Sequence, residues 1–270
     1  MTNNPTVLFV GAGNVASHLA RGLADSGVSI SGVYSRTGGS AKDLARAIGA
    51  CRYGTYDDIA DAPVADVVIF SLPDGPAEGV VSAVSPYFSA QGWQGTIFAH
   101  TSGTLPTDVL APLGGGRVGV FYPLQTFSKA STVDLSQVPF FIEGADIAAA
   151  DVLMALARRM SDNVHLTSPE RRKVLHIAGE LSCNFPNFLW ELTQKVLEGA
   201  GYPLRVVEPL VRETVDKAFA IGPHAAQTGP ARRRDTEVMS AHAEALPEDV
   251  AGVYRSLSDM IVKSHYSDKQ

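Results

Sequence analysis

The sequence is poor in cysteine, with two residues in a chain of 270. Two thiols cannot build the disulfide framework of a small secreted protein. Cys51 and Cys183 also show neither a CxxC spacing nor the His/Cys pattern of a zinc site. The first residues lack the basic segment of an export signal, and the apolar run at 7–10 ends in glycine. We therefore predict a cytoplasmic protein that holds no metal.

Long hydrophobic runs and an excess of basic charge are missing as well. The longest apolar candidate, residues 64–72, is much shorter than the ~20 residues that a membrane helix needs. The formal net charge is -6, whereas nucleic acids and anionic membranes attract basic proteins. These absences argue against nucleic acid or membrane as the main partner and favour a small molecule.

Hydrophobic residues make up 45% of the chain and charged residues 19%, which is typical of a folded globular protein. The first half alternates short β-branched runs with amphipathic or Ala-rich segments, the pattern of βαβ units on a parallel sheet. Helical spacing of apolar residues predicts helices over 15–25 and 40–48. Strands are expected at 6–10, 29–34, 67–71, 96–100, 117–121 and 140–143.

The character of the sequence changes after residues 164–166, where helical patterns replace strand-like runs. Ser168, Pro169 and Glu170 form a favourable helix start, because serine caps free amides, proline fits the first turn and glutamate suits the positive helix end. Helices are expected from Pro169 to about Gly199 and over 204–221 and 247–265. We predict an α/β fold in which a Rossmann-type doubly wound sheet, residues 1–167, precedes an all-helical domain, residues 168–270.

The strongest motif is GAGNVA at residues 11–16, which follows a predicted strand and opens a predicted helix. In this context Gly11 permits a tight turn, Gly13 lets the backbone approach a pyrophosphate, and Ala16 lets the helix pack close to the strand. The helix N-terminus then faces the phosphates. The alternative is a purely structural glycine turn. The predicted phosphate-binding residues are Gly11, Gly13, Asn14, Val15 and Ala16.

An NAD site usually carries an acidic residue about 20 positions after the glycines, and this chain has no carboxylate between Asp25 and Asp43. The second predicted strand ends instead in Ser35, Arg36 and Thr37, a guanidinium and two hydroxyls that suit the 2′-phosphate of NADP. The alternative is that Arg36 is a solvated loop residue. These three residues predict NADP as the cofactor.

Other loops follow strands at the same predicted edge of the sheet. Leu72 and Pro73 come after the strand at 67–71 and are expected to line the cofactor. His100, Thr101 and Ser102 end the next strand with groups that suit an anionic or carbonyl substrate, although a plain strand-to-helix turn has the same composition. Gln125 lies in YPLQTF, residues 122–127, and is a further candidate for substrate contact.

A polar stripe runs along the helix that begins at Pro169. Its members lie within about 100° of arc, because an α-helix advances 100° per residue. His176 and Asn184 are about 12 Å apart along the axis, so they can flank one metabolite, and Pro186 predicts a kink beside Asn184. We interpret the stripe as part of an active site or a domain interface, with a solvated face as the alternative. It comprises Lys173, His176, Glu180, Cys183, Asn184, Asn187 and Glu191.

The segment TGPARRRD, residues 228–235, places three arginines on a short loop. Arg232 and Arg234 are candidates to bind a substrate carboxylate or phosphate. The alternative is an exposed charged run that pairs locally with Asp235.

The chain resembles the Rossmann-like proteins with a C-terminal DUF2520 domain. The resemblance rests on five motifs taken together: GAGNVA, HTSG near residue 100, YPLQTF, the helix with His176 and SCNF, and TGPARRRD. Wider relatives include pyrroline-5-carboxylate reductase, ketopantoate reductase, the 6-phosphogluconate and β-hydroxyacid dehydrogenases, and the F420-dependent NADP oxidoreductases. The resemblance implies a dinucleotide domain, a helical domain like that of 6-phosphogluconate dehydrogenase, dimerisation through those helices, and an oxidoreductase without a settled substrate.

One position departs from this resemblance. The β-hydroxyacid dehydrogenases have a lysine four residues before the helix asparagine, and Glu180 occupies that position relative to Asn184. Their lysine acid/base mechanism therefore does not carry over to this chain. Histidine titrates near neutrality, so His176 or His100 is the expected proton carrier.

These observations predict an NADP(H)-dependent oxidoreductase that transfers hydride to or from a small, anionic carbonyl, imine or hydroxy compound. One alternative is a non-catalytic NADP(H)-binding sensor or regulatory protein. Another is a flavin or deazaflavin partner, as in the F420-dependent relatives. If the protein is an oxidoreductase, the residues expected to orient the substrate and move a proton are His176, Asn184, Ser102 and His100. The residues expected to contact the substrate are Thr101, Gln125, Glu180, Arg232 and Arg234.

Overall fold

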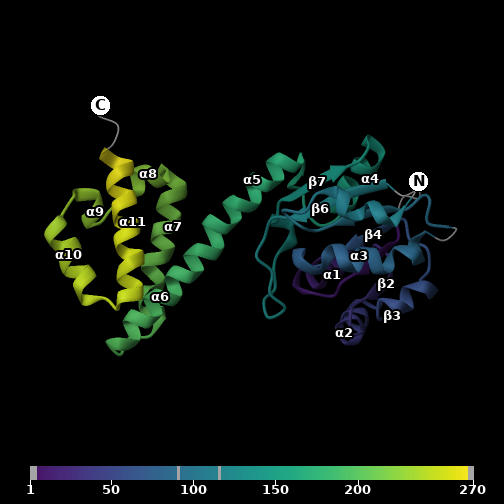
Figure 1. The fold of residues 1–270 in the computed structure, drawn as a ribbon, viewed down its shortest axis with the longest axis horizontal. Coiled ribbons are helices and arrows are strands. Elements are labelled where there is room, and N and C mark those ends of the chain that lie inside the picture. Colours follow the sequence, from purple (N-terminus) through teal and green to yellow (C-terminus); the bar gives the residue numbers. More distant parts are fainter. Residues whose placement is uncertain (1–4, 90–91, 115–116, 267–270) are drawn as a thin grey trace. The chain divides into compact units, whose positions relative to one another are not determined.

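A computed structural model describes residues 5–89, 92–114 and 117–266 of the chain (Figure 1). The chain divides into two compact units, Met1–Leu181 and Ser182–Gln270, which are described in turn. The sequence-based boundary after residue 167 lies just before helix α5, which begins at Pro169. The outer ends of the two predicted domains, residues 1–4 and 267–270, lie outside the described residues.

The first unit is built on an eight-stranded sheet in the order β3-β2-β1-β4-β5-β6-β7-β8. The order reverses between β1 and β4, as in a doubly wound Rossmann fold. Both central strands are buried along their whole length, which fits a parallel sheet covered on both faces. The strands are β1 Val7–Val10, β2 Ile30–Tyr34, β3 Tyr53–Gly54, β4 Val67–Phe70, β5 Ile97–His100, β6 Arg117–Pro123, β7 Phe140–Gly144 and β8 Val164–Leu166.

Helices cover both faces of this sheet (Figure 1). On one face Leu19, Leu44 and Leu153 belong to the same hydrophobic cluster, so α1 Asn14–Asp25, α2 Gly39–Ile48 and α4 Ile147–Ala157 pack there. The other face packs against α3 Asp74–Phe88 and the 3₁₀ segment Thr107–Leu113 through residues that include Val84 and Leu110. The predicted Rossmann architecture is therefore confirmed.

Strand β7 departs from the parallel pattern of the preceding strands. It pairs antiparallel with β6, in a register that places Phe121 opposite Ile142. Residues 124–139, all of them described, contain a 3₁₀ turn at Leu135–Gln137 and no α-helix. A parallel pair needs a crossover connection, usually a helix. After β7, α4 supplies such a crossover, and β8 returns parallel to β7.

Helix α5, Pro169–Gly179, begins where the sequence predicts it. The Ser168 hydroxyl accepts a hydrogen bond from the backbone N–H of Arg171 at 3.4 Å, and proline occupies the first turn. The single helix predicted to about Gly199 is interrupted by a π-helical turn over Glu180–Asn184. Pro186 has no amide hydrogen for the carbonyl of residue 182, and the regular α-helical pattern changes at this point.

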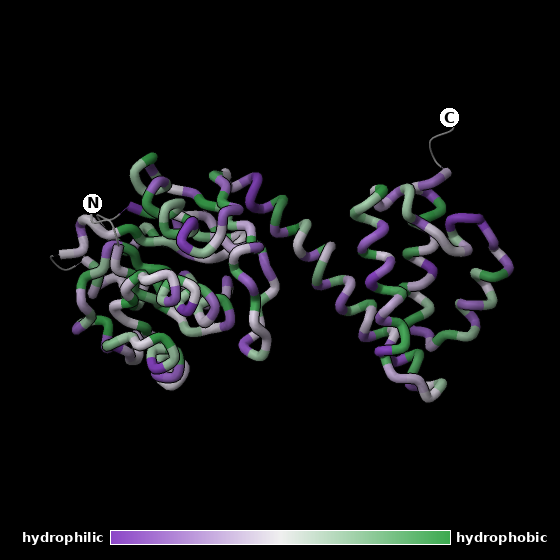
Figure 2. The backbone as a smooth tube through the Cα atoms, turned by 180° about the vertical axis from the view of Figure 1, so that it is seen from behind, coloured by the Kyte–Doolittle hydropathy of each residue, from purple (hydrophilic) through white to green (hydrophobic). Residues whose placement is uncertain are grey.

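The second unit contains only helices among its described residues, and most of them alternate hydrophobic and hydrophilic segments (Figure 2). Its buried side chains are few and small: Ala231, Ala243, Val250, Ala251 and Ser258. The unit comprises α6 Phe185–Gly199, a 3₁₀ segment Leu204–Val207, α7 Glu208–Ile221, α8 Pro223–Ala226, α9 Pro230–Arg233, α10 Thr236–Ala245 and α11 Glu248–Tyr266.

Candidate functional site

The turn between β1 and α1 is fixed by a glycine. Gly11 has a φ of 106°, and a Cβ atom there would collide with the carbonyl oxygen of Ser71. Its N–H donates to the carbonyl of Tyr34 at 2.7 Å. The turn therefore lies tightly between the ends of β2 and β4, and only glycine combines this φ with this close approach.

The N-terminus of α1 is open at this edge. Gly13 occupies the N-cap position, no side chain among the described residues caps the helix, and its first turn holds no acidic residue. A Cβ atom on Gly13 would meet no described atom within 4 Å. Asn14 is exposed, Val15 is half-buried, and Ala16 is fully buried. Free amides at the positive end of a helix form an anion site, and a pyrophosphate fits there.

The end of β2 carries hydroxyl and guanidinium groups. Ser35 is buried, and its Oγ lies 3.2 Å from Oγ of Ser40 at the start of α2. Arg36 and Thr37 are exposed. Burial raises the pKa of the Tyr56 phenol, and the charge and backbone of Arg36 partly offset that rise, which places Arg36 beside Tyr56. This cluster can bind a phosphate next to a nucleoside ribose.

Residues after β4 complete this part of the edge. The Ser71 N–H donates to the carbonyl of Val10 at 2.8 Å. The Leu72 side chain lies against the Gly11 turn, and Pro73 is exposed at the N-cap of α3. The predicted cofactor residues therefore gather at the carboxyl ends of β1, β2 and β4, the point in an open α/β sheet where ligands bind.

His100 ends β5 and is almost completely buried. Its Nδ1 accepts a hydrogen bond from the Ser102 N–H at 3.2 Å, and no described group lies within hydrogen-bond geometry of Nε2. Burial, together with the nearby charge of Arg172, lowers the pKa of His100 to about 4, although Asp74 and the Pro106 backbone act in the opposite direction. His100 is therefore neutral at physiological pH.

The loop after His100 satisfies most of its own polar groups. The Ser102 hydroxyl accepts hydrogen bonds from the N–H groups of Thr104 and Leu105, each at 3.0 Å. The Thr104 hydroxyl donates to Asp74 at the start of α3. Thr101 is buried, and its hydroxyl donates to that of Ser71 at 3.5 Å. The hydroxyl oxygen of Ser102 therefore stabilises the turn over residues 102–105 by accepting hydrogen bonds from its backbone.

A buried arginine that the sequence analysis did not single out holds this loop. Arg172, in the first turns of α5, is 1% exposed, and its Nε lies 2.6 Å from a carboxylate oxygen of Glu143 on β7. Its remaining nitrogens donate to the carbonyls of Ser102 at 3.0 Å and Leu105 at 2.9 Å. One guanidinium therefore ties α5, the sheet and the 102–105 loop together, in the fork geometry that arginine provides.

His176 follows Arg172 by one helical turn. Its Nδ1 lies 3.3 Å from the hydroxyl oxygen of Tyr122, and its Nε2 lies 3.9 Å from a carboxylate oxygen of Glu180. A Cβ atom on Gly103 would sit 2.5 Å from the His176 Nδ1, so this ring packs directly on the glycine backbone. The side chain of His176 remains 34% exposed.

Tyr122 is the second residue of this region that the sequence analysis did not single out. It is 8% exposed near the carboxyl end of β6, and its ring lies edge-on to that of His176 with centroids 6.3 Å apart. Burial raises the pKa of the phenol, as do the charges of Glu180 and Asp74, while Arg172 lowers it. Tyr122 is therefore a protonated phenol at neutral pH, and its hydroxyl lies within hydrogen-bond distance of the His176 Nδ1.

The remaining candidates lie elsewhere. Gln125 is exposed, and its side-chain oxygen accepts a hydrogen bond from the Thr126 N–H at 2.8 Å. Asn184 is exposed in the π-helical turn and belongs to the second unit. The structure therefore brings His100, Thr101, Ser102, His176 and Glu180 to one region of the first unit, and it places Asn184 in the other unit.

Arg232 and Arg234 also belong to the second unit, where they surround Tyr266. The segment is not wholly the loop that the sequence predicts, because Arg232 lies in the short helix α9 and Arg234 follows directly after it. Arg232 donates to the tyrosine hydroxyl at 3.3 Å, and the Arg234 guanidinium lies 4.9 Å from the ring centroid. The Asp235 carboxylate accepts a hydrogen bond from the Val238 N–H at 3.3 Å and caps α10. The carboxylate that the sequence offers as a local partner for these arginines is therefore engaged in capping a helix.

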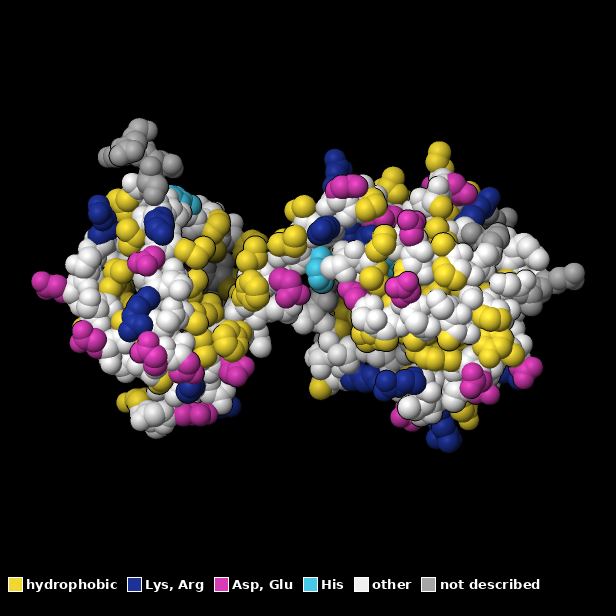
Figure 3. All heavy atoms as spheres, in the orientation of Figure 1, with side chains coloured by type: hydrophobic (Ala, Val, Ile, Leu, Met, Phe, Trp, Pro, Cys, Tyr) yellow, Lys and Arg dark blue, Asp and Glu magenta, His cyan; other side chains and the backbone are white. Residues whose placement is uncertain are grey.

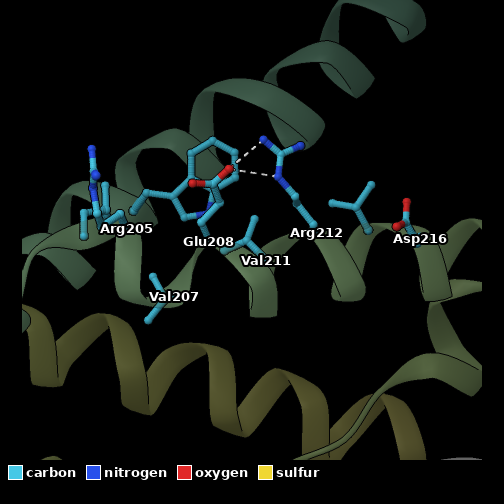
Figure 4. A pocket seen from close by; sticks show the side chains of 9 residues that line it. Arg205, Val207, Glu208, Val211, Arg212 and Asp216 are labelled. Atoms are coloured by element: carbon cyan, nitrogen blue, oxygen red, sulfur yellow. Dashed lines mark hydrogen bonds and ion pairs between the residues drawn. The ribbon is translucent and has the colours of Figure 1, made fainter.

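A pocket in the second unit is lined by α7, by residues of the preceding 3₁₀ segment and by Trp190 of α6 (Figure 4). Its lining is mainly apolar and includes Val207 and Val211, and Arg212 pairs with Glu208 at 2.8 Å. This apolar lining gives the pocket the character of a packing surface.

Comparisons with known proteins agree with this architecture. A model of the Rossmann-like domain matches residues 3–123, and a model of the domain of unknown function DUF2520 matches residues 138–261. A Bacteroides fragilis protein described as "putative NADP oxidoreductase BF3122" is 35% identical, with 96% of this chain and 98% of that chain covered at a TM-score of 0.86. No curated protein matches the sequence.

More distant structures share the fold. Pyrroline-5-carboxylate reductase from Coxiella burnetii is 16% identical over 98% of both chains, with a TM-score of 0.56. Reductive aminase from Aspergillus terreus, solved with NADPH and ethyl-5-oxohexanoate, is 14% identical over 97% of this chain and 95% of that chain, with a TM-score of 0.67.

The protein thus has an oxidoreductase-like, dinucleotide-binding fold. It belongs to the family in which a Rossmann-like domain is followed by a DUF2520 domain. Within the part of the chain that the structure describes, none of the helices is both long enough and apolar enough to cross a membrane.

Proposed function

We propose that the protein is an NADP(H)-dependent oxidoreductase that transfers hydride to or from a small, anionic carbonyl, imine or hydroxy compound. The observation that carries this proposal is the carboxyl edge of the sheet, where the open N-terminus of α1 and the Ser35–Thr37 cluster lie at neighbouring strands. A 35% identical relative is described as a "putative NADP oxidoreductase", and a protein of the same fold was solved with NADPH.

In this proposal the backbone of the glycine turn and the first turn of α1 bind the pyrophosphate. Arg36 binds the 2′-phosphate, with Ser35 and Thr37 as hydroxyl donors. When bound, NADPH supplies the hydride. The proposed cofactor residues are Gly11, Gly13, Asn14, Val15, Ala16, Ser35, Arg36, Thr37, Leu72 and Pro73.

The substrate is assigned to the edge beyond β4, beside the loop that follows β5. His176 is favoured over His100 as the proton carrier, because His176 is partly exposed, whereas a buried histidine with a pKa of about 4 stays neutral. Ser102 and Thr101 shape the loop, and Gln125 and Glu180 are substrate contacts in the proposal. Asn184 stays a predicted catalytic residue that orients the substrate, and Arg232 and Arg234 stay predicted substrate contacts, all three in the second unit.

A substrate screen tests the oxidoreductase proposal. Purified protein is incubated with NADPH and a panel of keto acids, cyclic imines and aldehydes, and with NADP⁺ and hydroxy acids, while the near-ultraviolet absorbance of NADPH is followed. We expect turnover with at least one anionic member. Tight NADPH binding without any turnover, together with a change in scattering profile, supports the sensor alternative, which the glutamate at position 180 keeps open.

We also propose that the helical unit forms a homodimer. Helices α6 and α7 have no buried side chain, and hydrophobic residues gather over them on the visible face (Figure 3). Leu210 is 66% exposed and Phe219 is 90% exposed. An apolar surface of this kind is typical of a subunit interface, and closed symmetric dimers are the commonest assemblies.

Sedimentation equilibrium tests the dimer proposal. We expect a dimer for the wild type and a monomer for Phe219→Asp, with Glu213→Lys, a charge change on the same helix, as the control variant. A monomeric wild type would contradict the proposal. Neither nucleic acid nor membrane is proposed as a partner, and the cytoplasmic location stays a prediction from the cysteine content.

A further inference from the structure

Tyr122 lies several strands away from the residues that are proposed to bind the 2′-phosphate. The residues proposed to bind the 2′-phosphate follow β2, and β6 lies on the other side of β1, beyond β4 and β5. A dinucleotide is an elongated molecule that binds across the point where the strand order reverses. The end opposite to the 2′-phosphate therefore belongs on the side of the sheet that includes β6. Tyr122 is a titratable side chain near the carboxyl end of that strand.

Tyr122 is a buried side chain whose hydroxyl contacts a partly exposed histidine. Its ring is buried, yet its hydroxyl contacts the Nδ1 of His176, whose other nitrogen faces Glu180 on a partly exposed helix. A buried phenol needs a hydrogen-bond partner, and a backbone carbonyl would be sufficient if the ring only filled the core. The hydroxyl of Tyr122 instead meets an imidazole nitrogen of a partly exposed side chain, a type of group that can carry a proton in either direction.

The histidine ring is held in place from two sides. Gly103 leaves no room between the backbone and the His176 Nδ1, and Arg172 fixes both the 102–105 loop and the start of α5. Positioned acid–base groups owe their efficiency to this kind of fixed geometry. Glycine at position 103 and arginine at position 172 thus act as positioning residues for the same pair.

We propose that Tyr122 is a catalytic residue that protonates the substrate, with its proton restored through Nδ1 of His176. This assignment rests on the proposed oxidoreductase function. Tyr122 would then take the role of proton donor that the helix lysine has in the β-hydroxyacid dehydrogenases. Glu180, which occupies the position of that lysine, lies next to the Tyr122–His176 pair.

The proton balance of the reduction is as follows. The carbon of the substrate C=O or C=N gains hydride, and its oxygen or nitrogen takes the proton from the Tyr122 hydroxyl. The O–H bond of Tyr122 breaks as Nδ1–H of His176 passes its proton to the tyrosine oxygen, and in the same transfer Nε2 of His176 takes up the H⁺ that the reduction consumes from solvent. The pair ends with as many protons as it had, and the imidazole proton returns from Nε2 to Nδ1 by exchange with solvent before the next turnover. Oxidation of a hydroxy or amino compound runs these transfers in reverse.

The experiment compares Tyr122→Phe with Tyr87→Phe, the same chemical change near the far end of α3. With the best substrate of the panel, we expect Tyr122→Phe to lower kcat by about 10²–10⁴-fold, the usual contribution of a general acid. KM and the Kd for NADPH should change by less than about threefold, because the change removes a transition-state contact. Tyr87→Phe should resemble the wild type.

A second readout is independent of turnover. The imidazole nitrogen signals of His176 are recorded by NMR in wild type, in Tyr122→Phe and in Tyr87→Phe, with assignment from His176→Gln. Loss of the phenol should move the Nδ1 signal, because its hydrogen-bond partner is gone, and the control should leave it in place. His176→Gln should lower kcat by less than Tyr122→Phe does, because the phenol remains.

The outcomes separate the two proposals. Wild-type turnover that Tyr122→Phe leaves unchanged overturns the assignment of Tyr122 and leaves the oxidoreductase function standing. An unchanged His176 signal in Tyr122→Phe overturns the paired relay. Absence of turnover with every compound overturns the oxidoreductase function, and the catalytic assignment falls with it.

Discussion

Breaking the buried Glu143–Arg172 pair should destabilise the first unit more than breaking any of its exposed ion pairs. Glu143→Gln keeps the size and shape of the side chain and removes its charge. Arg172 is 1% exposed, so its guanidinium would be left in the protein interior with no compensating carboxylate. Loss of one partner from a buried pair costs about 3–5 kcal/mol. Against a typical unfolding free energy of about 5–15 kcal/mol, this loss is large but leaves a measurable folded state.

Two further variants should lose less stability than Glu143→Gln. Arg172→Lys keeps the positive charge, but a single ammonium cannot reach Glu143 and both loop carbonyls at once, so we expect an intermediate loss of about 2–3 kcal/mol. Arg117→Met breaks the exposed pair with Asp146, in which both side chains are nearly half exposed, and should cost about 1 kcal/mol or less. That variant retains the Asp146 cap on α4.

The assay is urea unfolding followed by tryptophan fluorescence. The chain has two tryptophans, and Trp93 is buried in the first unit, whereas Trp190 lies in the second. A Trp190→Phe background therefore reports the first unit alone, which matters because two units need not unfold in one step. A loss for Glu143→Gln no larger than that for Arg117→Met would refute the reasoning.

Three other changes test the geometry of the site. Gly11→Ala should abolish dinucleotide binding in calorimetric titrations, since its Cβ would collide with the Ser71 carbonyl; native-like binding would contradict the tight turn. Gly103→Ala should displace His176 and lower turnover, whereas Gly79→Ala, in open space within α3, should not; equal rates in both variants would argue against the packed ring. Because the folded-state pKa of His100, about 4, lies below the value of 6.5 for a free histidine, the native state binds fewer protons between these values. Stability should therefore fall by up to about 3 kcal/mol as the pH drops from 6.5 to 4, and His100→Asn should lose this dependence in pH-dependent unfolding curves.

The sequence predicts those parts of the site whose structure depends on residues close together in the chain. The glycine turn and the first turn of α1 are local, because the strand, the turn and the helix follow one another within residues 7–25. The start of α5 is local for the same reason. Helix α3 is local too, yet it went unpredicted, because Gly75, Pro76, Gly79 and Pro86 interrupt its helical pattern.

The parts that escaped prediction depend on contacts between distant segments. Arg172 reads as a surface residue in a charged helical turn, and its burial follows from a carboxylate on β7 and from carbonyls in the 102–105 loop. Tyr122 was assigned to the loop after β6. The strand in fact extends to Pro123, because the antiparallel partner β7 continues the pairing to Phe140. The direction of β7 follows from a connection without a helix, which periodicity alone does not show.

The most direct test of the account is calorimetric titration with NADPH and, separately, NADH. The titrations use the wild type, Arg36→Ala and the control Arg46→Ala. The control also removes an exposed arginine, but one that lies in the last turn of α2. The account predicts that NADPH binds more tightly than NADH and that Arg36→Ala weakens NADPH binding by about 10- to 100-fold, the value of a charge-assisted contact. Binding of NADH and the behaviour of the control should be unchanged. Failure of both nucleotides to bind the wild type would contradict the oxidoreductase proposal.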